Sequence, residues 1–134
     1  MVAWTKNWST TTLALAYNIA MNPLQFYKCL ADQTRLTCLM LIQQEGELCV
    51  CELMESIQES QPKISRHLAQ LKKHQLLSDR RQGQWVFYRL SPNLPAWTLE
   101  ILKTSAAPSK TIIKESYIRL SLMRERPERD KACC

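Results

Sequence analysis

Apolar side chains recur at helical spacing along most of the chain. A short helix is predicted over residues 24–30, and a second helix begins after Asp32 or Thr34, either of which can act as its N-cap. The second helix ends at Gly46, because glycine readily adopts the left-handed conformation that closes a helix. Residues 1–20 show no clear pattern and are treated as an extension.

The next strong helical pattern begins at Ser60, a good N-cap that is followed by a proline in the first turn. One side of this helix is apolar and carries Ile64, Leu68 and Leu71. The opposite side is polar and basic and carries Lys63, Arg66, Gln70 and Lys73. A shorter helix is expected from about Cys51 to Ile57, so the pair predicts a helix-turn-helix.

Two β-prone runs follow, over residues 76–81 and 85–90, and are joined across Gly83. This arrangement predicts a hairpin that lies beside the basic helix as a wing. Helical patterns resume over residues 95–103 and 111–124, interrupted at Pro108, and the charged end RERPERDKACC is expected to be mobile.

Composition supports a mainly α fold with a small β-hairpin. The chain has 134 residues, 46% of them hydrophobic, which suits one domain with one core. Two glycines provide little of the turn chemistry that an all-β fold needs. We therefore expect an extension over residues 1–20, a winged helix-turn-helix domain over 21–103, and a C-terminal helix with a cysteine-ended tail over 104–134.

The net charge of +6 is concentrated in one part of the chain. Residues 60–90 hold seven basic side chains and one acidic side chain, so this block accounts for the whole excess. A solvated charged face is the ordinary explanation, but a basic block on a helix-turn-helix favours contact with the phosphates of double-stranded DNA.

Recognition of a major groove requires side chains near a helix N-terminus that can bond base edges or phosphates. The candidates in the helix are Ser60, Gln61, Lys63, Ser65 and Arg66. The candidates in the wing are Arg80, Arg81 and Gln84.

Six cysteines occur at positions 29, 38, 49, 51, 133 and 134, a distribution that does not suit a disulfide framework. Reduced thiols in a cytoplasm fit better, and no apolar run reaches the roughly 18 residues that a membrane span needs. The sequence also lacks CxxC and a glycine-rich phosphate loop, so we expect no enzyme.

The run ELCVCEL, residues 47–53, places two thiols one residue apart. They are either small core hydrophobes or a pair of soft ligands for a thiophilic ion. Such side chains lie on the same side of a strand but about 200° apart on a helix, so chelation requires a non-helical or unwound first turn. A helix N-terminus is also expected to lower the pKa of both thiols.

Four segments together resemble the arsenical-resistance operon repressors of the ArsR/SmtB family: FYKCLADQTRLTCLMLI, GELCVCEL, SQPKISRHLAQLKKHQLL and DRRQGQWVFYRLSP. The resemblance covers residues 23–97. It implies a homodimeric winged helix-turn-helix repressor, with terminal helices at the dimer interface, that leaves its operator when arsenite or antimonite, As(III) or Sb(III), binds. It also implies that Cys49 and Cys51 are the metal ligands, with no permanent cofactor.

One departure concerns the third ligand. Many members of this family have a third cysteine three residues after the second, where this chain has Met54. Cys133 or Cys134, from either subunit, is an alternative donor, whereas Cys29 and Cys38 lie in apolar patterns and are expected in the core. A repressor that senses cadmium, lead or oxidants through the same thiols, and a non-DNA-binding arsenic carrier, remain as alternatives.

Overall fold

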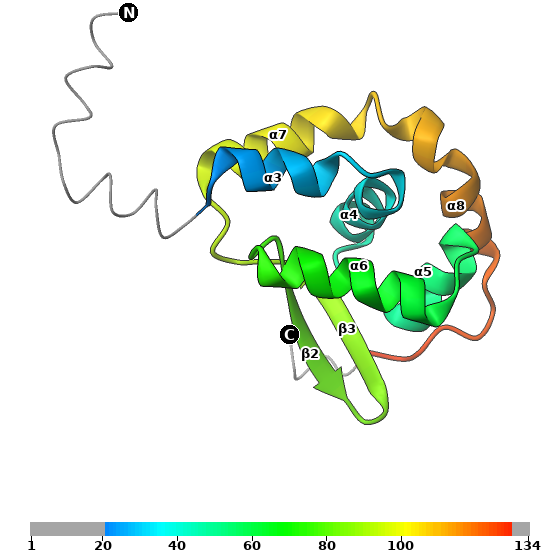
Figure 1. Cartoon of the computed structure of the whole chain (residues 1–134). Helices are drawn as coiled ribbons and strands as arrows, with labels where there is room; N and C mark the ends of the chain where they lie inside the picture. The colour runs from blue at the N-terminus through cyan, green and yellow to red at the C-terminus, as the bar shows by residue number, and fades with distance from the viewer. Residues whose placement is uncertain (1–20, 130–134) are drawn as a thin grey trace, which may run out of the picture.

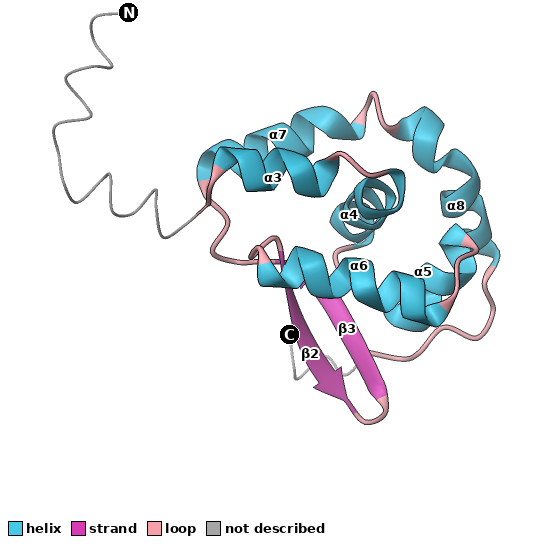
Figure 2. Cartoon of the chain, viewed as in Figure 1, coloured by secondary structure: helices cyan, strands magenta, loops and turns pink. Residues whose placement is uncertain are grey.

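The computed structural model describes residues 21–129. Figures 1 and 2 show a layer of helices with a β-hairpin extending from one side. The helices are α3 (Pro23–Leu30), α4 (Gln33–Glu45), α5 (Val50–Ile57), α6 (Gln61–Lys73), α7 (Ala96–Ala106) and α8 (Lys110–Leu122). The strands are β1 (Leu48–Cys49), β2 (Leu77–Gln82) and β3 (Trp85–Leu90).

The helix boundaries follow the capping signals of the sequence. The Asp32 side chain accepts the N–H of Arg35 at 3.0 Å and so caps α4, which ends at Gly46 with φ of 88°. Ser60 caps α6 by accepting the N–H of Lys63. The mainly α, winged helix-turn-helix fold is confirmed, with α5 and α6 as the helix-turn-helix.

The wing has one strand more than the expected hairpin. The three strands are antiparallel in the order β1-β3-β2, and Cys49 of β1 is paired with Phe87 of β3. β1 occupies only Leu48–Cys49, and α5 begins at Val50, slightly earlier than expected. This short strand fixes Cys49 to the sheet directly before the helix-turn-helix.

The core lies between α4, α5, α6 and the returning helix α8. The inward residues of α6 (Ile64, Leu68 and Leu71) are fully buried there, and Ile113 and Leu120 of α8 join the same cluster. At the other end of the layer, Phe26 of α3 meets Trp97 of α7 edge-on, with ring centroids 5.2 Å apart. Residue 103, the last residue of the expected winged helix-turn-helix domain, lies within α7. Helix α8, which follows it, packs on the core of the same domain.

Residues 123–129, which we name the C-terminal strap, run from the end of α8 past α5 toward the wing (Figure 1). Pro127 is buried, and Arg126 and Arg129 form ion pairs with residues of the domain. Within the tail that was expected to be mobile, Arg126 and Arg129 thus contact the buried carboxylate of Glu52 on α5, while mobility itself stays a prediction. Residues 130–134, with Cys133 and Cys134, lie outside the described residues, as does the predicted extension over 1–20.

Candidate functional site

Cys49 and Cys51 lie side by side where β1 passes into α5. Their sulfur atoms are 2.7 Å apart. Cys49 is the N-cap of α5 and has extended backbone angles, φ −91° and ψ 169°, so its side chain is not rotated away as it would be inside a helix. Of the two arrangements that chelation allows, the structure therefore has the non-helical one, and no unwinding is needed to bring the thiols together.

Cys49 is buried and Cys51 is half-buried. Burial, together with the hydrogen bond to Cys51, raises the pKa of the Cys49 thiol well above its usual range. The expectation that the helix N-terminus lowers the pKa is therefore wrong for Cys49, because loss of solvation outweighs the helix dipole.

Glu52, which sequence reasoning missed, organises this turn. Its Oε1 accepts the N–H of Cys49 at 2.9 Å, and its carboxylate is fully buried. Burial by itself would raise the pKa of Glu52, but hydrogen bonds from Arg129, Cys49 and Arg126 outweigh it and keep the pKa below its usual value. An acid three residues after an N-cap is the spacing of a capping box, a local signal that could have revealed this role.

The described residues supply two thiols to this site and no third. Met54, at the position where the family resemblance led us to look for a third cysteine, is partly buried and packs against the core. Cys29 and Cys38 are buried core residues, as expected, and burial raises the pKa of Cys38 to about 12. Within residues 21–129, no three or more His, Cys, Asp and Glu side chains are grouped as a metal site.

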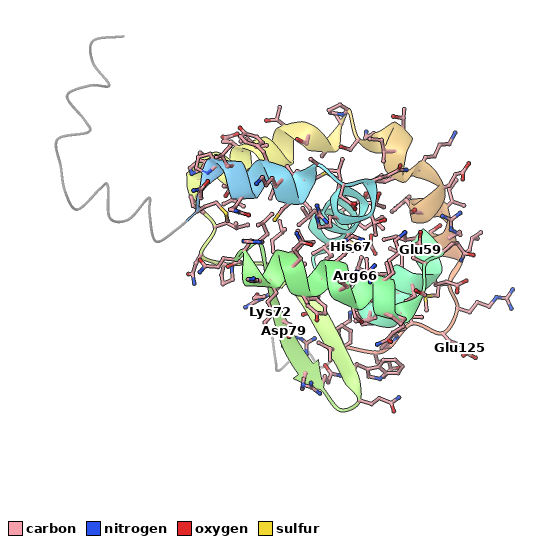
Figure 3. All side chains as sticks on the ribbon, in the orientation of Figure 1. Glu59, Arg66, His67, Lys72, Asp79 and Glu125 are labelled. Carbon is pink, nitrogen blue, oxygen red and sulfur yellow. The ribbon has the colours of Figure 1, made fainter. Side chains whose placement is uncertain are left out.

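The outer face of α6 presents the predicted polar stripe. The exposed residues of this face are Ser60, Gln61, Arg66, Gln70 and Lys73. Arg66, which is labelled on α6 in Figure 3, is one of these exposed residues. Lys63 and Ser65 are half-buried, and the Nζ of Lys63 is 2.9 Å from a carboxylate oxygen of Glu59.

The two arginines of β2 occupy different environments. Arg81 and Gln84, at the tip of the wing, are exposed. Arg80 instead forms two hydrogen bonds of 2.7 Å to the carboxylate of Glu47, and its guanidinium lies 4.7 Å from the ring centroid of Phe87. The guanidinium of Arg80 thus joins β2 to the segment before β1, and its contact with DNA stays a prediction.

Comparisons with known proteins agree with this architecture. Residues 32–79 match the bacterial regulatory protein, arsR family. The arsenic resistance transcriptional regulator ArsR2 of Pseudomonas putida is 49% identical over 114 residues, which is 85% of this chain and 99% of that protein. The chain belongs to the ArsR family.

Two further proteins are similar to this ArsR-family chain. The arsenical resistance operon repressor of Escherichia coli K12 is 56% identical over 80 residues, 60% of this chain and 68% of that one. The crystal structure of the AntR antimony-specific transcriptional repressor is 26% identical and has a TM-score of 0.54, over 64% of this chain and 75% of that chain. Family members are DNA-binding transcriptional regulators, and this chain has the same winged helix-turn-helix.

A half-buried arginine links the basic helix of this ArsR-family protein to the rest of the domain. Arg35 of α4 donates to the carbonyl oxygens of Cys29, at 2.9 Å, and Lys28, at 3.0 Å, at the end of α3. Its Nη1 also lies 3.3 Å from Nδ1 of His67 on α6. The contact between Arg35 and His67 therefore connects α6 with α4 and with the end of α3.

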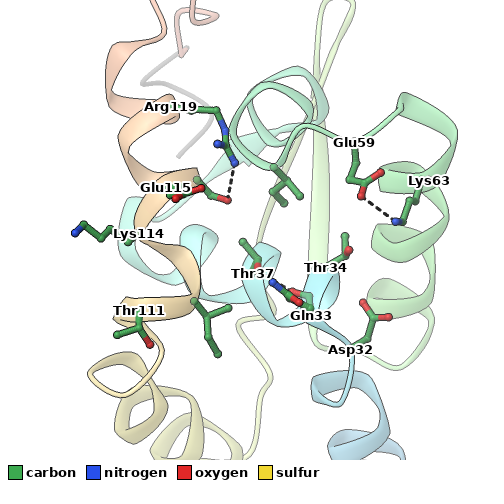
Figure 4. A pocket seen from close by; sticks show the side chains of 13 residues that line it. Asp32, Gln33, Thr34, Thr37, Glu59, Lys63, Thr111, Lys114, Glu115 and Arg119 are labelled. Carbon is green, nitrogen blue, oxygen red and sulfur yellow. Dashed lines mark hydrogen bonds and ion pairs between the residues drawn. The ribbon is translucent and has the colours of Figure 1, made fainter.

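The thiol pair lies outside a cleft that borders the helix-turn-helix of this ArsR-family chain. This cleft of about 660 Å³ lies between α8, the start of α4 and the turn that joins α5 to α6, as Figure 4 shows. Its wall includes Glu59, Lys63 and Arg119, and neither Cys49 nor Cys51 lines it. No helix in the described range is long and apolar enough to span a membrane.

Proposed function

We propose that this protein is a transcriptional repressor that binds operator DNA as a homodimer and leaves it when trivalent arsenic or antimony binds Cys49 and Cys51. The observation that carries the proposal is the position of the thiol pair, which forms the first turn of the helix-turn-helix, with sulfur atoms 2.7 Å apart. The names of the arsenic and antimony regulators among its relatives support the choice of inducer. A reduced, cytoplasmic setting is part of the proposal, because the site needs free thiols.

The thiol pair can bind arsenous acid by ligand exchange. Each thiol replaces one hydroxyl group on arsenic, so an As–S bond forms, an As–O bond breaks, and the thiol proton leaves in a water molecule. Arsenic remains trivalent throughout. Soft thiolate ligands select such a centre over hard cations.

Binding at the thiol pair is coupled to DNA through α5. This helix packs against α6, β1 and β3, so a change at its first turn alters the support of both the basic helix and the wing. The inducer and DNA favour different arrangements of this turn. Binding of one therefore weakens binding of the other, and this is what releases the protein from DNA.

The outer faces of α3 and α8 support the homodimer. Leu24 and Tyr27 of α3 are exposed, and so are Ile112, Tyr117, Ile118 and Leu122 of α8. Large apolar side chains gathered on terminal helices are typical of a surface that pairs with another subunit.

The proposal is tested by fluorescence anisotropy of the reduced protein on a labelled duplex from upstream of its own gene, titrated with arsenite or antimonite at fixed salt. We expect tight binding that either inducer reverses. Binding that responds only to cadmium, lead or an oxidant would assign a different signal to the same thiols. Absence of DNA binding would contradict the repressor and favour an arsenic carrier.

A further inference from the structure

Arg129, in the C-terminal strap, binds the carboxylate that organises the thiol turn. Its guanidinium donates to both carboxylate oxygens of Glu52 and, at 3.1 Å, to the carbonyl oxygen of Glu47. Glu52 in turn accepts the N–H of Cys49 at 2.9 Å. A single buried carboxylate therefore lies between the guanidinium of Arg129 and the backbone of Cys49.

The same guanidinium also contacts the wing. It lies 4.6 Å from the ring centroid of Phe87, a fully buried residue of β3. One residue before Arg129, the carbonyl oxygen of Glu128 accepts a hydrogen bond of 3.0 Å from the side chain of Gln82, at the end of β2. The strap is thus attached to both strands of the hairpin.

Strand pairing directly holds only one of the two cysteines to the wing. Cys49 belongs to β1 and is paired with Phe87 of β3, whereas Cys51 lies in α5, beyond the end of β1. Glu52 follows Cys51 in the first turn of the same helix, so the two residues move together. A displacement of Cys51 therefore reaches β3 through Glu52 and Arg129, as well as through the packing of α5 on β3.

Of the two arginines that bind Glu52, Arg129 is the one that contacts the wing. Arg126 bonds Glu52 and, at 3.2 Å, Glu45 at the end of α4. Arginine suits the position of Arg129, because its planar guanidinium can bind a carboxylate and stack on an aromatic ring at the same time. A buried carboxylate is costly to leave unpaired, so Glu52 and Arg129 move together rather than separate.

We propose that Arg129 is a positioning residue that couples the thiol pair to the wing, so that an inducer bound at Cys49 and Cys51 weakens the contact of the wing with operator DNA. This inference rests on the proposed function and names a residue through which release occurs. Arg129 itself binds neither the inducer nor DNA. The side chains whose position changes are Arg81 and Gln84, which are exposed at the tip of the wing.

The coupling is measured as the ratio of the operator dissociation constants with and without saturating arsenite, obtained by anisotropy on the full chain. Arg129→Gln removes a charge from Glu52 together with the contact to the wing. Arg126→Gln is the matched control, because it removes a charge from the same carboxylate and leaves the contact to the wing in place. The ratio should fall about tenfold in Arg129→Gln, the scale on which residues of a coupling network act, and remain that of the wild type in Arg126→Gln.

This ratio separates coupling from a purely structural role. A variant that only folds less completely raises both dissociation constants by the same factor, and saturation makes the ratio independent of how tightly the variant binds arsenite. Equal ratios in Arg129→Gln and in the wild type would overturn the inference and leave the proposed function standing. An equal fall in Arg129→Gln and Arg126→Gln would also overturn it, because Glu52 alone would then account for the effect.

Amide hydrogen exchange of the DNA-free protein gives a second readout. In the wild type, arsenite should change the exchange of residues 77–90, which form the hairpin, as well as that of residues 48–54. In Arg129→Gln the change should be confined to residues 48–54. An equal change over residues 77–90 in both proteins would contradict coupling through Arg129.

Gln82→Ala tests the other attachment of the strap and decides the matter if Arg129→Gln does not fold. It removes the hydrogen bond to Glu128 at the end of β2, while Arg129 keeps its bonds to Glu52 and Arg80 keeps its bonds to Glu47. The ratio should fall here as well, and a ratio equal to that of the wild type would overturn the role of the strap. A wild-type protein that arsenite does not release from DNA would overturn the proposed function, and this inference with it.

Discussion

At the scale of single residues, the site depends on an extended cysteine, a helical cysteine and one buried carboxylate. Cys49 caps α5 in an extended conformation, and this alone brings its sulfur beside that of Cys51. Glu52 holds the turn by accepting the backbone N–H of Cys49 and is itself held by Arg126 and Arg129. The chemistry of the thiols and the stability of the turn therefore rest on different residues.

Cys51→Ser should abolish induction and leave operator binding intact, because serine keeps the size of the side chain but is a poor ligand for a soft ion. Anisotropy of operator DNA with and without arsenite measures both properties. Cys29→Ala, which removes a buried thiol away from the turn, is the matched control and should remain inducible. A Cys51→Ser protein that arsenite still releases would exclude this residue as a ligand.

Glu52→Gln should lower the free energy of unfolding at pH 7 by about 2 kcal/mol, the scale of a lost hydrogen bond to a charged group. The pKa of Glu52 is lowered in the folded protein, so its contribution is fully present above the unfolded pKa of about 4.3 and disappears as the pH falls through the folded value. Urea unfolding of both proteins between pH 3 and pH 7 should therefore show a difference that is constant near neutrality and shrinks in acid. A difference that grows in acid would contradict the assigned charge state.

At the scale of elements, α6 and β2 each carry some polar side chains that bind other parts of the domain and others that are exposed to solvent. On α6, Arg66 and Lys73 are exposed while His67 is held by Arg35. On β2, neighbouring side chains point to opposite sides, so Arg81 is exposed and Arg80 binds Glu47. Charge alone does not identify which basic residues meet DNA.

Arg66→Ala should weaken operator binding and reduce the slope of log affinity against log salt by about 0.9, the value expected for one lost phosphate contact. Anisotropy titrations at several salt concentrations measure the slope. A slope and affinity equal to those of the wild type would exclude Arg66 from the DNA surface.

Arg81→Ala and Arg80→Ala form a matched pair on the wing. Arg81→Ala should reduce the salt slope by about 0.9, whereas Arg80→Ala should keep the slope and lower the stability of the fold, because Arg80 is paired with Glu47. Salt-dependent anisotropy and urea unfolding of both variants separate the two roles. The reverse pattern would return Arg80 to the DNA surface.

At the scale of the whole molecule, the chain folds back on itself and leaves its terminal helices open. The strap joins α4, α5 and the wing through ion pairs, while α3 and α8 present apolar side chains outward. The first feature connects Arg129 of the strap, through Glu52, to the thiol pair, and the second is the surface that we propose for another subunit.

Ile118→Glu should convert the proposed dimer to monomers, because it places a charge on the exposed apolar face of α8. Sedimentation measures the oligomeric state, and anisotropy should show weaker operator binding, since two half-sites are no longer held together. Lys103→Glu, at an exposed polar position on α7, is the control and should remain dimeric. A dimeric Ile118→Glu protein would exclude this face from the interface.

The sequence by itself determined the elements, the wing and the candidate thiols. Caps such as Asp32 and Ser60, the left-handed Gly46 and the helical periodicity of α6 are local signals, because they depend on residues within a turn or two of one another. The proximity of Cys49 and Cys51 also follows from two neighbouring residues once the start of α5 is known.

Only the tertiary structure decided which charged residues form ion pairs within the fold and which are exposed to solvent. Arg80 and Glu47 are 33 positions apart, and Arg129 and Glu52 are 77 positions apart, so no local pattern links them. Burial raises the pKa of Cys49, whereas hydrogen bonds from Arg129, Cys49 and Arg126 lower that of Glu52 despite its burial, and both effects need segments that meet only in the folded chain. The physical reason is that desolvation and ion pairing act through space, whereas periodicity and capping act along the chain.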